Sequence, residues 1–371
     1  MQKTIKQFIR DKIWHREFSE TQINKYVGYY ENTYLAHATD QQLRENAASG
    51  GAVSALLMYM LEQKLIDGAL VLDSVIADGK VRPKFIIAQS VEEIMQAQGS
   101  KYSAVYFSQQ ALPLLQAFDG RLAVVALPCD ARILQAYRSK HAEFNEKIKM
   151  VIALYCGHNS EPELTDWTID NLSKSNVQLV DFKYRTGHWR GELEATFDDG
   201  SVVKKPFSHF SDYRNVYFFA QKKCHHCCDH FGYFCDISAG DIWSPEMKNN
   251  PVKHTSLITR TARGESLVRQ AAKDQLIATS SADIKQITNG QARTLPFHYN
   301  VSARAQVAPL FGTKIKDITR ERVSLLDTIL ALIAIANERF SNSRFGGWVV
   351  KHMPRPILKL YLYLFKGLES I

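Results

Sequence analysis

Between residues 36 and 155, stretches with the apolar spacing of a helix alternate with short apolar runs typical of buried strands. In the first helical stretch apolar residues recur at i, i+3, i+4, i+7 and i+8, which predicts an amphipathic helix over residues 51–64. The residues that carry this pattern are Val53, Leu56, Leu57, Met60 and Leu61. Short apolar runs predict buried strands at 69–72, 122–127 and 150–155, and two more helices are expected at 91–98 and 131–138. Alternation of this kind is typical of a largely parallel sheet with helices on its faces.

After about residue 178 the pattern changes to short alternating runs. Residues 180–184 and 192–197, followed by an Asp-Gly turn at 198–201, predict a β-hairpin. The remaining elements are expected as a strand at 257–260 and helices at 264–273 and 321–338. The predicted fold class is therefore α/β, mixed with α+β features. It has a largely parallel sheet with flanking helices, a C-terminal half that contains the β-hairpin, and a helical tail.

These patterns divide the 371 residues into four parts. Residues 1–35 predict a short helical arm, because their apolar side chains follow an amphipathic spacing. Residues 36–120 form an N-terminal half, residues 121–300 form a C-terminal half, and residues 301–371 form a helical tail with a basic, aromatic end. A chain of this length suits two domains or one large α/β unit.

The composition, with 45% hydrophobic and 23% charged residues, excludes an intrinsically disordered protein. Residues 1–30 lack the continuous apolar core of a signal peptide, and no run of about 18 apolar residues could cross a membrane. We therefore expect a cytoplasmic protein. Its six cysteines are too few for a disulfide scaffold, and in a reducing compartment clustered thiols favour metal binding or redox chemistry.

The net charge of +8 is concentrated at the C-terminal end. Residues 339–371 contain six cations and one carboxylate, Glu369, so the rest of the chain is closer to neutral. The body lacks the interleaved basic and aromatic residues of a nucleic-acid-binding protein, and no nucleic-acid partner is expected. The tail is also apolar and aromatic, and it is interrupted by Pro354 and Pro356. It suits either a peripheral contact with the inner face of the membrane or a helix docked on the body or on a second subunit.

The start of the helix 51–64 is a candidate site for a phosphate-containing cofactor. Ser49, Gly50 and Gly51 stand where free N–H groups and the positive end of the helix dipole attract a phosphate. The alternative interpretation is a serine N-cap followed by flexible glycines.

A second small-residue loop, at residues 99–103, carries chemistry of the same kind. Ser100, Lys101 and Tyr102 place a hydroxyl, a cation and an aromatic ring on three successive residues. A lysine there suits a phosphate or a flavin oxygen. A solvated turn is the alternative, and the loop taken alone favours that alternative.

Four cysteines are candidates for one metal centre. Cys129 follows the predicted strand 122–127 and Cys156 follows the next strand, so parallel pairing would place both thiols at the carboxyl edge of the sheet. Taken singly, each could equally be a buried, inert thiol. Cys224 and Cys227 form a C-x2-C pair, whose short spacing lets both thiolates bind one centre. The four suit one iron–sulfur cluster or one structural zinc ion, and Cys228 and Cys235 have no assigned partner.

Three further residues are candidates for catalysis. His158 and Asn159 follow Cys156 closely and could serve as a proton donor and an orienting amide. Arg185 belongs to residues 184–191, which combine two arginines, a histidine and a tryptophan around two glycines. The alternative for this segment is a hairpin loop with exposed cations.

Six of these fragments, in this order, resemble the coenzyme F420 hydrogenase/dehydrogenase β-subunit family. They are Ala48-Ser49-Gly50-Gly51, Gly99-Ser100-Lys101-Tyr102, Leu127-Pro128-Cys129, Tyr155-Cys156-Gly157-His158-Asn159, Cys224-x-x-Cys227 and Asp236-Ile237-Ser238-Ala239-Gly240-Asp241. The resemblance covers roughly residues 36–290. It implies a flavin- and iron–sulfur-dependent oxidoreductase with FAD in the half 36–120 and one 4Fe–4S cluster in the half 121–300.

The resemblance also implies a role for each candidate. Ser49, Gly50, Gly51, Ser100, Lys101 and Tyr102 would contact FAD. Cys129, Cys156, Cys224 and Cys227 would bind the cluster, with zinc at the same cysteines as the alternative. Because no cysteine precedes residue 129, the chain holds one such cluster, and its electrons come from a separate donor protein of the ferredoxin type or from a reduced deazaflavin.

The substrate is expected to be a small molecule or a polyprenyl-linked compound, since stand-alone relatives resemble accessory proteins of surface-polysaccharide biosynthesis. The runner-up function is a zinc-stabilised, non-redox scaffold or a nucleotide-sugar-binding module on the same fold, and a homo-oligomer is among the alternatives. Asp130 stands where the family typically has glutamine, which puts a carboxylate beside the cluster. If ionised, that carboxylate should lower the cluster's reduction potential.

Overall fold

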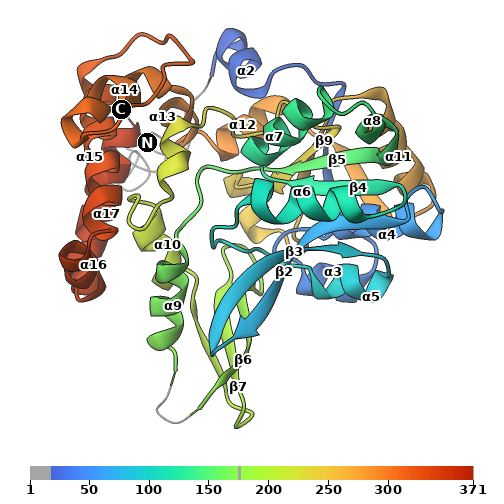
Figure 1. Cartoon of the computed structure of the whole chain (residues 1–371), viewed down its shortest axis with the longest axis horizontal. Helices are drawn as coiled ribbons and strands as arrows, with labels where there is room; N and C mark the ends of the chain where they lie inside the picture. Colours follow the sequence, from blue (N-terminus) through green and yellow to red (C-terminus); the bar gives the residue numbers. More distant parts are fainter. Residues whose placement is uncertain (1–17, 174–176, 371) are drawn as a thin grey trace, which may run out of the picture.

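An eight-stranded sheet forms the centre of the computed structural model, which describes residues 18–173 and 177–370 (Figure 1). Its strands lie in the order β11-β1-β10-β9-β5-β4-β2-β3. They are β1 (Asn32–Ala38), β2 (Gly68–Ala77), β3 (Lys80–Ala88), β4 (Leu122–Ala126), β5 (Ile148–Leu154), β9 (Ile237–Asp241), β10 (Thr255–Thr259) and β11 (Ile277–Ser281). The four middle strands, β9, β5, β4 and β2, are parallel, and the pairs outside them are antiparallel. The predicted α/β class with a largely parallel central sheet is confirmed.

Helices cover both faces of this sheet, because its central strands bury side chains on both sides. Along β4, Ala123 packs into one core, while its neighbours Leu122 and Val124 pack into the other. The first core takes side chains from α3 (Gln41–Asn46), α4 (Ala52–Glu62), α5 (Val91–Gln96) and α11 (Ala262–Lys273). The second takes them from α6 (Phe107–Ala117), α7 (Pro128–Arg138) and α8 (Glu143–Lys147). This arrangement leaves the carboxyl edge of the parallel strands free for a site.

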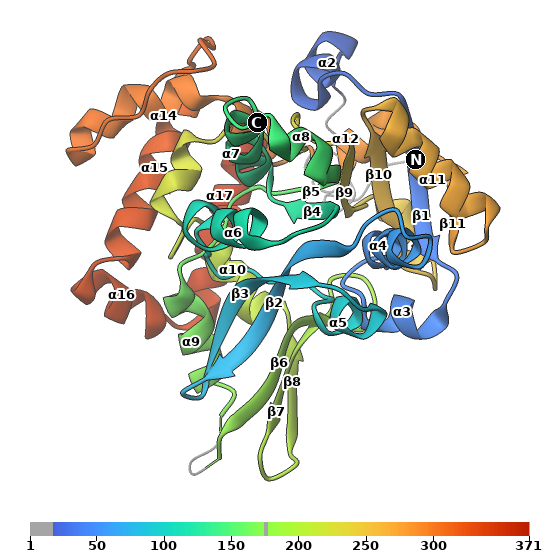
Figure 2. The same cartoon turned by 45° about the vertical axis from the view of Figure 1, so that its right-hand side comes forward.

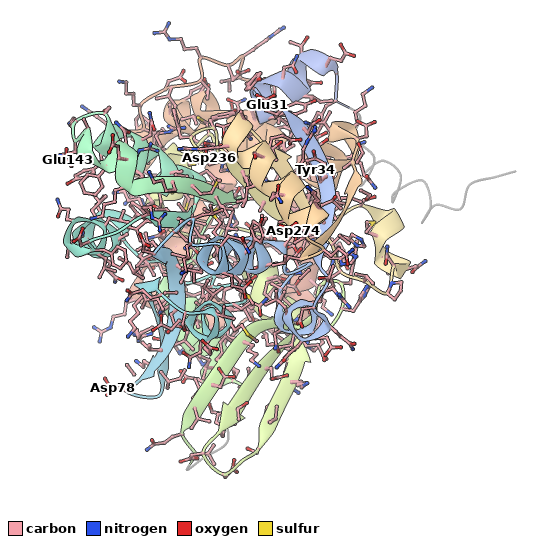
Figure 3. All side chains as sticks on the ribbon, turned by 90° about the vertical axis from the view of Figure 1, so that its right-hand side faces the viewer. Glu31, Tyr34, Asp78, Glu143, Asp236 and Asp274 are labelled. Atoms are coloured by element: carbon pink, nitrogen blue, oxygen red, sulfur yellow. The ribbon has the colours of Figure 1, made fainter. Side chains whose placement is uncertain are left out.

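A buried carboxylate ties the middle of the sheet together. Asp236, labelled in Figure 3, precedes β9 and accepts hydrogen bonds from the Val151 N–H (2.8 Å) and the Thr261 hydroxyl (2.7 Å). It also accepts one from Nε of Arg263 at 2.6 Å. These bonds join β5, the start of β9 and the start of α11, so they fix the register in which β9 lies beside β5.

Among the elements of the large sheet region that depart from the sequence prediction are two that contain a proline. The predicted strand 69–72 extends through Gly68–Ala77 and turns back into β3, which contains Pro83. A proline removes a ladder hydrogen bond, and it is tolerated here because β3 is an edge strand. The helix α6 was not predicted, and it too contains a proline, Pro113.

A second, three-stranded sheet projects beside the large one (Figure 2). Its strands are β6 (Leu179–Thr186), β7 (Glu192–Phe197) and β8 (Val202–Pro206). The predicted hairpin of β6 and β7 is present, but the Asp-Gly turn at 198–201 joins β7 to β8 instead. The hairpin's own connection is the loop 187–191.

The C-terminal helices gather on one side of the molecule (Figure 1). With the small sheet they form the largest core, so the tail is packed on the body and is not a separate segment. The helices of this region are α9 (Pro162–Asp170), α10 (Ser208–Arg214), α13 (Leu295–Tyr299), α14 (Val301–Val307), α15 (Leu325–Ser341), α16 (Arg344–Lys351) and α17 (Arg355–Ser370). Leu358, Leu362 and Phe365 of α17 are buried in that core. No helix among the described residues is long and apolar enough to cross a membrane.

The boundaries predicted at residues 35 and 120 do not separate structural layers. Residues 1–17 of the predicted arm lie outside the described residues, and the rest of it contains α2 (Glu20–Val27) and the first part of β1. That strand pairs with β10 and β11 in the middle of the C-terminal half. Around it, α2 and α12 (Ile284–Gly290) share a small core with α13. Both halves therefore contribute strands to one sheet.

Close backbone packing at the start of α4 makes Gly50 a test of this fold. A Cβ at Gly50 would lie 2.6 Å from the Ala36 carbonyl oxygen and 2.8 Å from the Thr255 nitrogen, both backbone atoms. We predict that Gly50→Ala lowers the free energy of unfolding by about 1–3 kcal/mol, measured by urea denaturation. Gly157→Ala is the control, because a Cβ there meets nothing within 4 Å. Equal stability of the two variants would contradict the packing described.

Candidate functional site

A cleft opens at the carboxyl edge of the parallel strands, where open α/β sheets bind ligands. It encloses about 1,510 Å³ of space free of protein atoms, part of it open to solvent. Eight of the residues predicted for the site line it: Ser49, Gly51, Ser100, Lys101, Tyr102, Cys156, His158 and Asn159. The two small-residue loops and the loop after β5 therefore face one space. Gly50, Arg185, Cys129, Cys224 and Cys227 do not line it.

The N-terminus of α4 faces the cleft without a side-chain cap. Gly51 is the N-cap residue, with φ of 76°, and no side chain caps the helix there. Ser49, predicted as the alternative N-cap, instead donates its hydroxyl to the His254 carbonyl at 2.8 Å. The first residues of the helix, Ala52 and Val53, line the cleft. An uncapped helix start offers free N–H groups and a partial positive charge to an anion.

Lys101 adds a buried cation to the same space. Its ammonium group donates to the carbonyl oxygens of Ala97 and, at 3.0 Å, Gln98. Burial lowers the pKa of Lys101 to about 8, against an opposing effect of Asp73. The neighbouring Tyr102 ring lies 5.5 Å from the Tyr184 ring, centroid to centroid. This loop is therefore held by the core and is not a solvated turn.

The four predicted cysteine ligands come from three segments of the chain. Cys129 is in the first turn of α7, directly after β4, and Cys156 follows the end of β5. Cys224 is in the 3-10 helix η1 (Lys222–His226), and Cys227 ends it. All four side chains are half-buried. Cys129 and Cys156 therefore follow the ends of neighbouring parallel strands, as predicted. Cys224 and Cys227 come from a 3-10 helix later in the chain.

Short backbone bridges bring these segments together. Ser160 forms one β-bridge with Ser103 and another with Ala220. The Gln221 N–H donates to the Asn159 carbonyl at 3.0 Å, and the Asn159 N–H donates to the Cys224 sulfur at 3.3 Å. The loop 99–103, the loop after Cys156 and the C-x2-C segment are thus one hydrogen-bonded unit.

The thiols affect one another's ionisation. Burial raises the pKa of Cys129, and Asp130, Cys227 and Cys156 raise it further. Burial likewise raises the pKa of Cys156, with Cys224 as the strongest neighbouring charge. The pKa of Cys227 rises to about 11. Thiols in such a site give up their protons when a metal replaces them.

The four thiols suit either one 4Fe–4S cluster or a single zinc ion. A zinc ion would draw four thiolates to about 2.3 Å from one point. A 4Fe–4S cluster binds each thiolate at a different iron, so its four ligands stay further apart.

Cationic side chains surround the thiols. Burial lowers the pKa of Lys223, but the charges of Cys129, Asp130 and Cys224 outweigh it and raise that pKa. Arg304, which is buried, donates to the Cys227 carbonyl at 2.8 Å. Arg214 lines the cleft beside Cys156. Cations beside half-buried thiolates offset part of the thiolates' negative charge.

Several buried polar atoms near the cleft and the thiols lack a hydrogen-bond partner among the described residues. A polar atom buried without a partner costs free energy, so a cluster of them indicates a bound group or ordered water. The atoms are Gln98 Oε1, Ser103 Oγ, Ser160 Oγ, Arg214 Nε and Gln221 Oε1. Together with the uncapped helix and the thiols, they fit a polar cofactor in the cleft and a cluster beside it.

His158 and Asn159 are buried where the cleft meets the thiols. Nε2 of His158 lies 2.9 Å from the Arg214 carbonyl, and its ring is stacked on Tyr217 with centroids 4.4 Å apart. Burial, helped by the Arg214 charge, holds the pKa of His158 well below its usual range. The Asn159 amide donates to the Ser103 carbonyl at 3.3 Å. Both residues are therefore rigidly placed, and the histidine is neutral at physiological pH.

Arg185 lies outside the main cleft. It donates to Asp241 at 2.5 Å and to the Trp189 carbonyl at 3.1 Å, and it stacks 4.9 Å from the Trp243 ring. It lines a smaller cavity of about 320 Å³, which shares Ser49 and Asp241 with the main cleft. In this position it connects the loop 187–191 to the end of β9.

Sequence reasoning missed three cations of the site, Lys223, Arg214 and Arg304. Lys223 directly precedes Cys224, and a basic residue beside a ligand cysteine was a signal available in the sequence. Arg214 ends α10 and contacts the loop after Cys156 through His158, and no sequence pattern indicates that contact.

Two family models match the chain over the strands and loops that build the site. One is the N-terminal part of the coenzyme F420 hydrogenase/dehydrogenase β subunit, at residues 33–110, and the other is its C terminus, at residues 119–285. The chain belongs to this family. The resemblance predicted from the six sequence fragments is confirmed, and its extent agrees with residues 36–290.

Two similar proteins are subunits of oxidoreductases. The chain is 28% identical over 262 residues to the coenzyme F420 hydrogenase subunit beta of Methanothermobacter thermautotrophicus, covering 68% of this chain and 85% of that one. It is 26% identical over 259 residues to the F420-dependent formate dehydrogenase 1 subunit beta of Methanococcus maripaludis, covering 68% of this chain but only 62% of the relative. The names of these relatives therefore support a redox role for this chain as a member of the family.

A solved structure shares the fold. It is a chain of the F420-reducing [NiFe] hydrogenase complex from Methanosarcina barkeri, with a TM-score of 0.60 and 19% identity. The match covers 79% of this chain and 98% of that one.

The depressed pKa of Lys101 would make the binding of a phosphate-containing cofactor in the cleft pH-dependent. The ammonium form, which attracts a phosphate, is present below pH 8 and is lost as the pH rises through that value. We predict that the Kd for FAD, measured by fluorescence titration, rises as the pH is raised from about 7 to about 9. Lys101→Gln should weaken binding at pH 7 by about tenfold or more and flatten this profile. An unchanged profile in the variant would exclude Lys101 as the phosphate ligand.

Proposed function

We propose that this protein is an oxidoreductase subunit that binds FAD in the cleft and one 4Fe–4S cluster at Cys129, Cys156, Cys224 and Cys227. One observation carries the proposal: Cys156 lines the cleft and is also one of the four neighbouring thiols. A cofactor in the cleft and a cluster on the thiols would therefore be adjacent. That adjacency is what transfer of electrons between them requires.

The residues assigned to FAD have complementary properties. The start of α4, with Ser49 and Gly51 before it, and the ammonium group of Lys101 would bind its phosphates. Gly50 would support this turn from outside the cleft, because its N–H donates to the Thr255 hydroxyl. Ser100 and Tyr102 would complete the wall of the cleft. Bound FAD would supply both two-electron exchange with a substrate and one-electron exchange with a cluster.

The candidate catalytic residues would act through position. His158 is neutral and donates its one N–H, at Nε2, to the Arg214 carbonyl, so it would offer Nδ1 as a hydrogen-bond acceptor and would not store a proton. Asn159 would orient groups in the cleft while its N–H supports the Cys224 sulfur. Arg185 would shape the cleft's rim through Asp241.

Membership of the family supports two kinds of redox partner. The names of the relatives contain F420, which supports a reduced deazaflavin as one electron donor, with a ferredoxin-like protein as the other. The resemblance further suggests a small-molecule or polyprenyl-linked substrate in surface-polysaccharide biosynthesis. A zinc-stabilised, non-redox scaffold or a nucleotide-sugar-binding module on this fold is the rival function.

Anaerobic purification with metal and flavin analysis tests the proposal. We predict about four iron and four sulfide per chain, together with flavin absorbance. Cys129→Ser, Cys156→Ser and Cys224→Ser should each lose most of the iron, because each removes one thiolate. Cys228→Ser is the matched control, since it removes a half-buried thiol next to Cys227 and should keep the iron. Stoichiometric zinc without flavin would favour the rival function instead.

We also infer that the C-terminal helices contact a membrane surface. The outward side of α16 and α17 exposes Phe345, Trp348, Ile357, Leu360 and Leu364, although the inward side of α17 is buried in the core. Arg344 and Lys359 are exposed among them. Apolar and aromatic side chains with cations suit the interface of an anionic membrane.

The exposed face can be altered without disturbing the core. We predict that Trp348→Glu combined with Leu360→Glu lowers binding to phosphatidylglycerol–phosphatidylcholine vesicles at least tenfold in co-sedimentation. Leu310→Glu is the control, because Leu310 is exposed but lies outside these helices. Truncation after residue 344 would be a poor test, since it removes the buried Leu358, Leu362 and Phe365. Wild-type protein that fails to co-sediment would refute the inference.

A further inference from the structure

An exposed patch of apolar and cationic side chains lies directly outside the thiols. It consists of Tyr106, Arg132, Ile133, Lys222, Lys223 and Phe234, and it is called the α7 patch below. Tyr106 is 52% exposed, Ile133 is 37% exposed and Phe234 is 42% exposed. Large apolar side chains at this degree of exposure beside a buried reactive centre are more informative than scattered ones.

The patch is continuous with the thiol centre through direct contacts. On α7, Cys129, Arg132 and Ile133 are spaced i, i+3 and i+4, so they share one side of the helix. The Arg132 guanidinium lies 5.7 Å from the Phe234 ring, and its Nη2 lies 3.9 Å from the Cys228 sulfur.

The other edge of the patch is joined to the centre in the same way. The Lys223 ammonium lies 5.8 Å from the Tyr106 ring and 4.0 Å from the Asp130 carboxylate. Both edges of the patch therefore meet the residues that flank Cys129 and Cys227.

The charge of the patch is of one sign. Lys222 is exposed, and Arg132 and Lys223 are half-buried. The nearby carboxylates Asp130 and Asp229 are buried, so no carboxylate is exposed to a partner, although Asp130 offsets part of the Lys223 charge from 4.0 Å away. A surface with apolar anchors and an excess of exposed cations attracts a partner that is acidic around an apolar contact.

We propose that the α7 patch is the docking surface for a small acidic electron-transfer protein of the iron–sulfur type. The inference rests on the proposed function, because docking matters only if the thiols hold a redox centre. Each encounter would move one electron inward, oxidising the partner by one electron and reducing the centre by one, and no proton crosses the interface. Electron-transfer partners typically dock through small, transient interfaces of this kind, with a few apolar anchors among charges.

Binding to an acidic bacterial ferredoxin tests the inference without relying on turnover. The wild-type holoprotein should bind it with a Kd that rises steeply with salt, because the attraction is electrostatic. Ile133→Glu and Lys222→Glu should each raise the Kd at low salt by about tenfold or more, measured by biolayer interferometry. Neither residue lines the cleft, and neither is a candidate ligand of the cluster.

Matched controls separate this surface from a general charge effect. Ile329→Glu alters an isoleucine with the same 37% exposure on α15, and Lys314→Glu removes an exposed lysine elsewhere. Both should leave the Kd unchanged, and all four variants should keep the iron content and the rate of reduction by dithionite. A Kd that Ile133→Glu and Lys222→Glu do not alter, or that all four variants raise equally, would overturn the inference.

The same experiment distinguishes failure of the patch from failure of the proposed function. Iron and flavin present, with ferredoxin binding insensitive to the patch variants, would overturn the docking surface alone. A wild-type protein with neither iron nor flavin would overturn the proposed function, and the docking inference with it.

Discussion

The parallel pairing of β4 with β5 is the constraint on which the site depends. Val125 is opposite Ile152 and Ala126 is opposite Ala153, so the two strands end at the same level. The residues that follow, Cys129 on one and Cys156 on the other, are therefore delivered to one edge of the sheet. A shift of register would separate them, and hydrophobic burial on both faces of these strands prevents such a shift.

The position of the second pair of thiols, Cys224 and Cys227, depends on backbone bridges and not on strand register. Ser160 bridges to Ser103 on one side and to Ala220 on the other, through backbone hydrogen bonds that need no particular side chain. This junction draws the loop of Lys101 and the C-x2-C segment towards the strand ends. The cleft and the thiols are thus two sides of one junction, and a change in either loop would be transmitted to both.

The contrast between strand register and backbone bridges explains which parts of the site could be predicted from the sequence. The positions of Cys129 and Cys156 were predictable, because strand ends can be recognised from apolar runs and parallel strands share an edge. The C-x2-C pair could be recognised by spacing, but its place beside them could not, since a backbone bridge leaves no pattern. Elements that contain proline, β3 with Pro83 and α6 with Pro113, were missed because proline usually argues against a strand or a helix interior.

The charge beside the thiols is more balanced than the sequence indicated. Asp130 was expected to lower the potential of a cluster if ionised, but burial raises the pKa of its carboxyl group, and Lys223 acts in the opposite direction. With the Lys223 ammonium 4.0 Å away, an ionised Asp130 belongs to a pair without net charge. Its field at the thiols is then largely offset, and the remaining cations, Arg214 and Arg304, are left to oppose the charge of the thiolates. Asp229 and Glu161 act on Cys227 and Cys224 in the opposite sense to these arginines, so neither sign of charge dominates around the thiols.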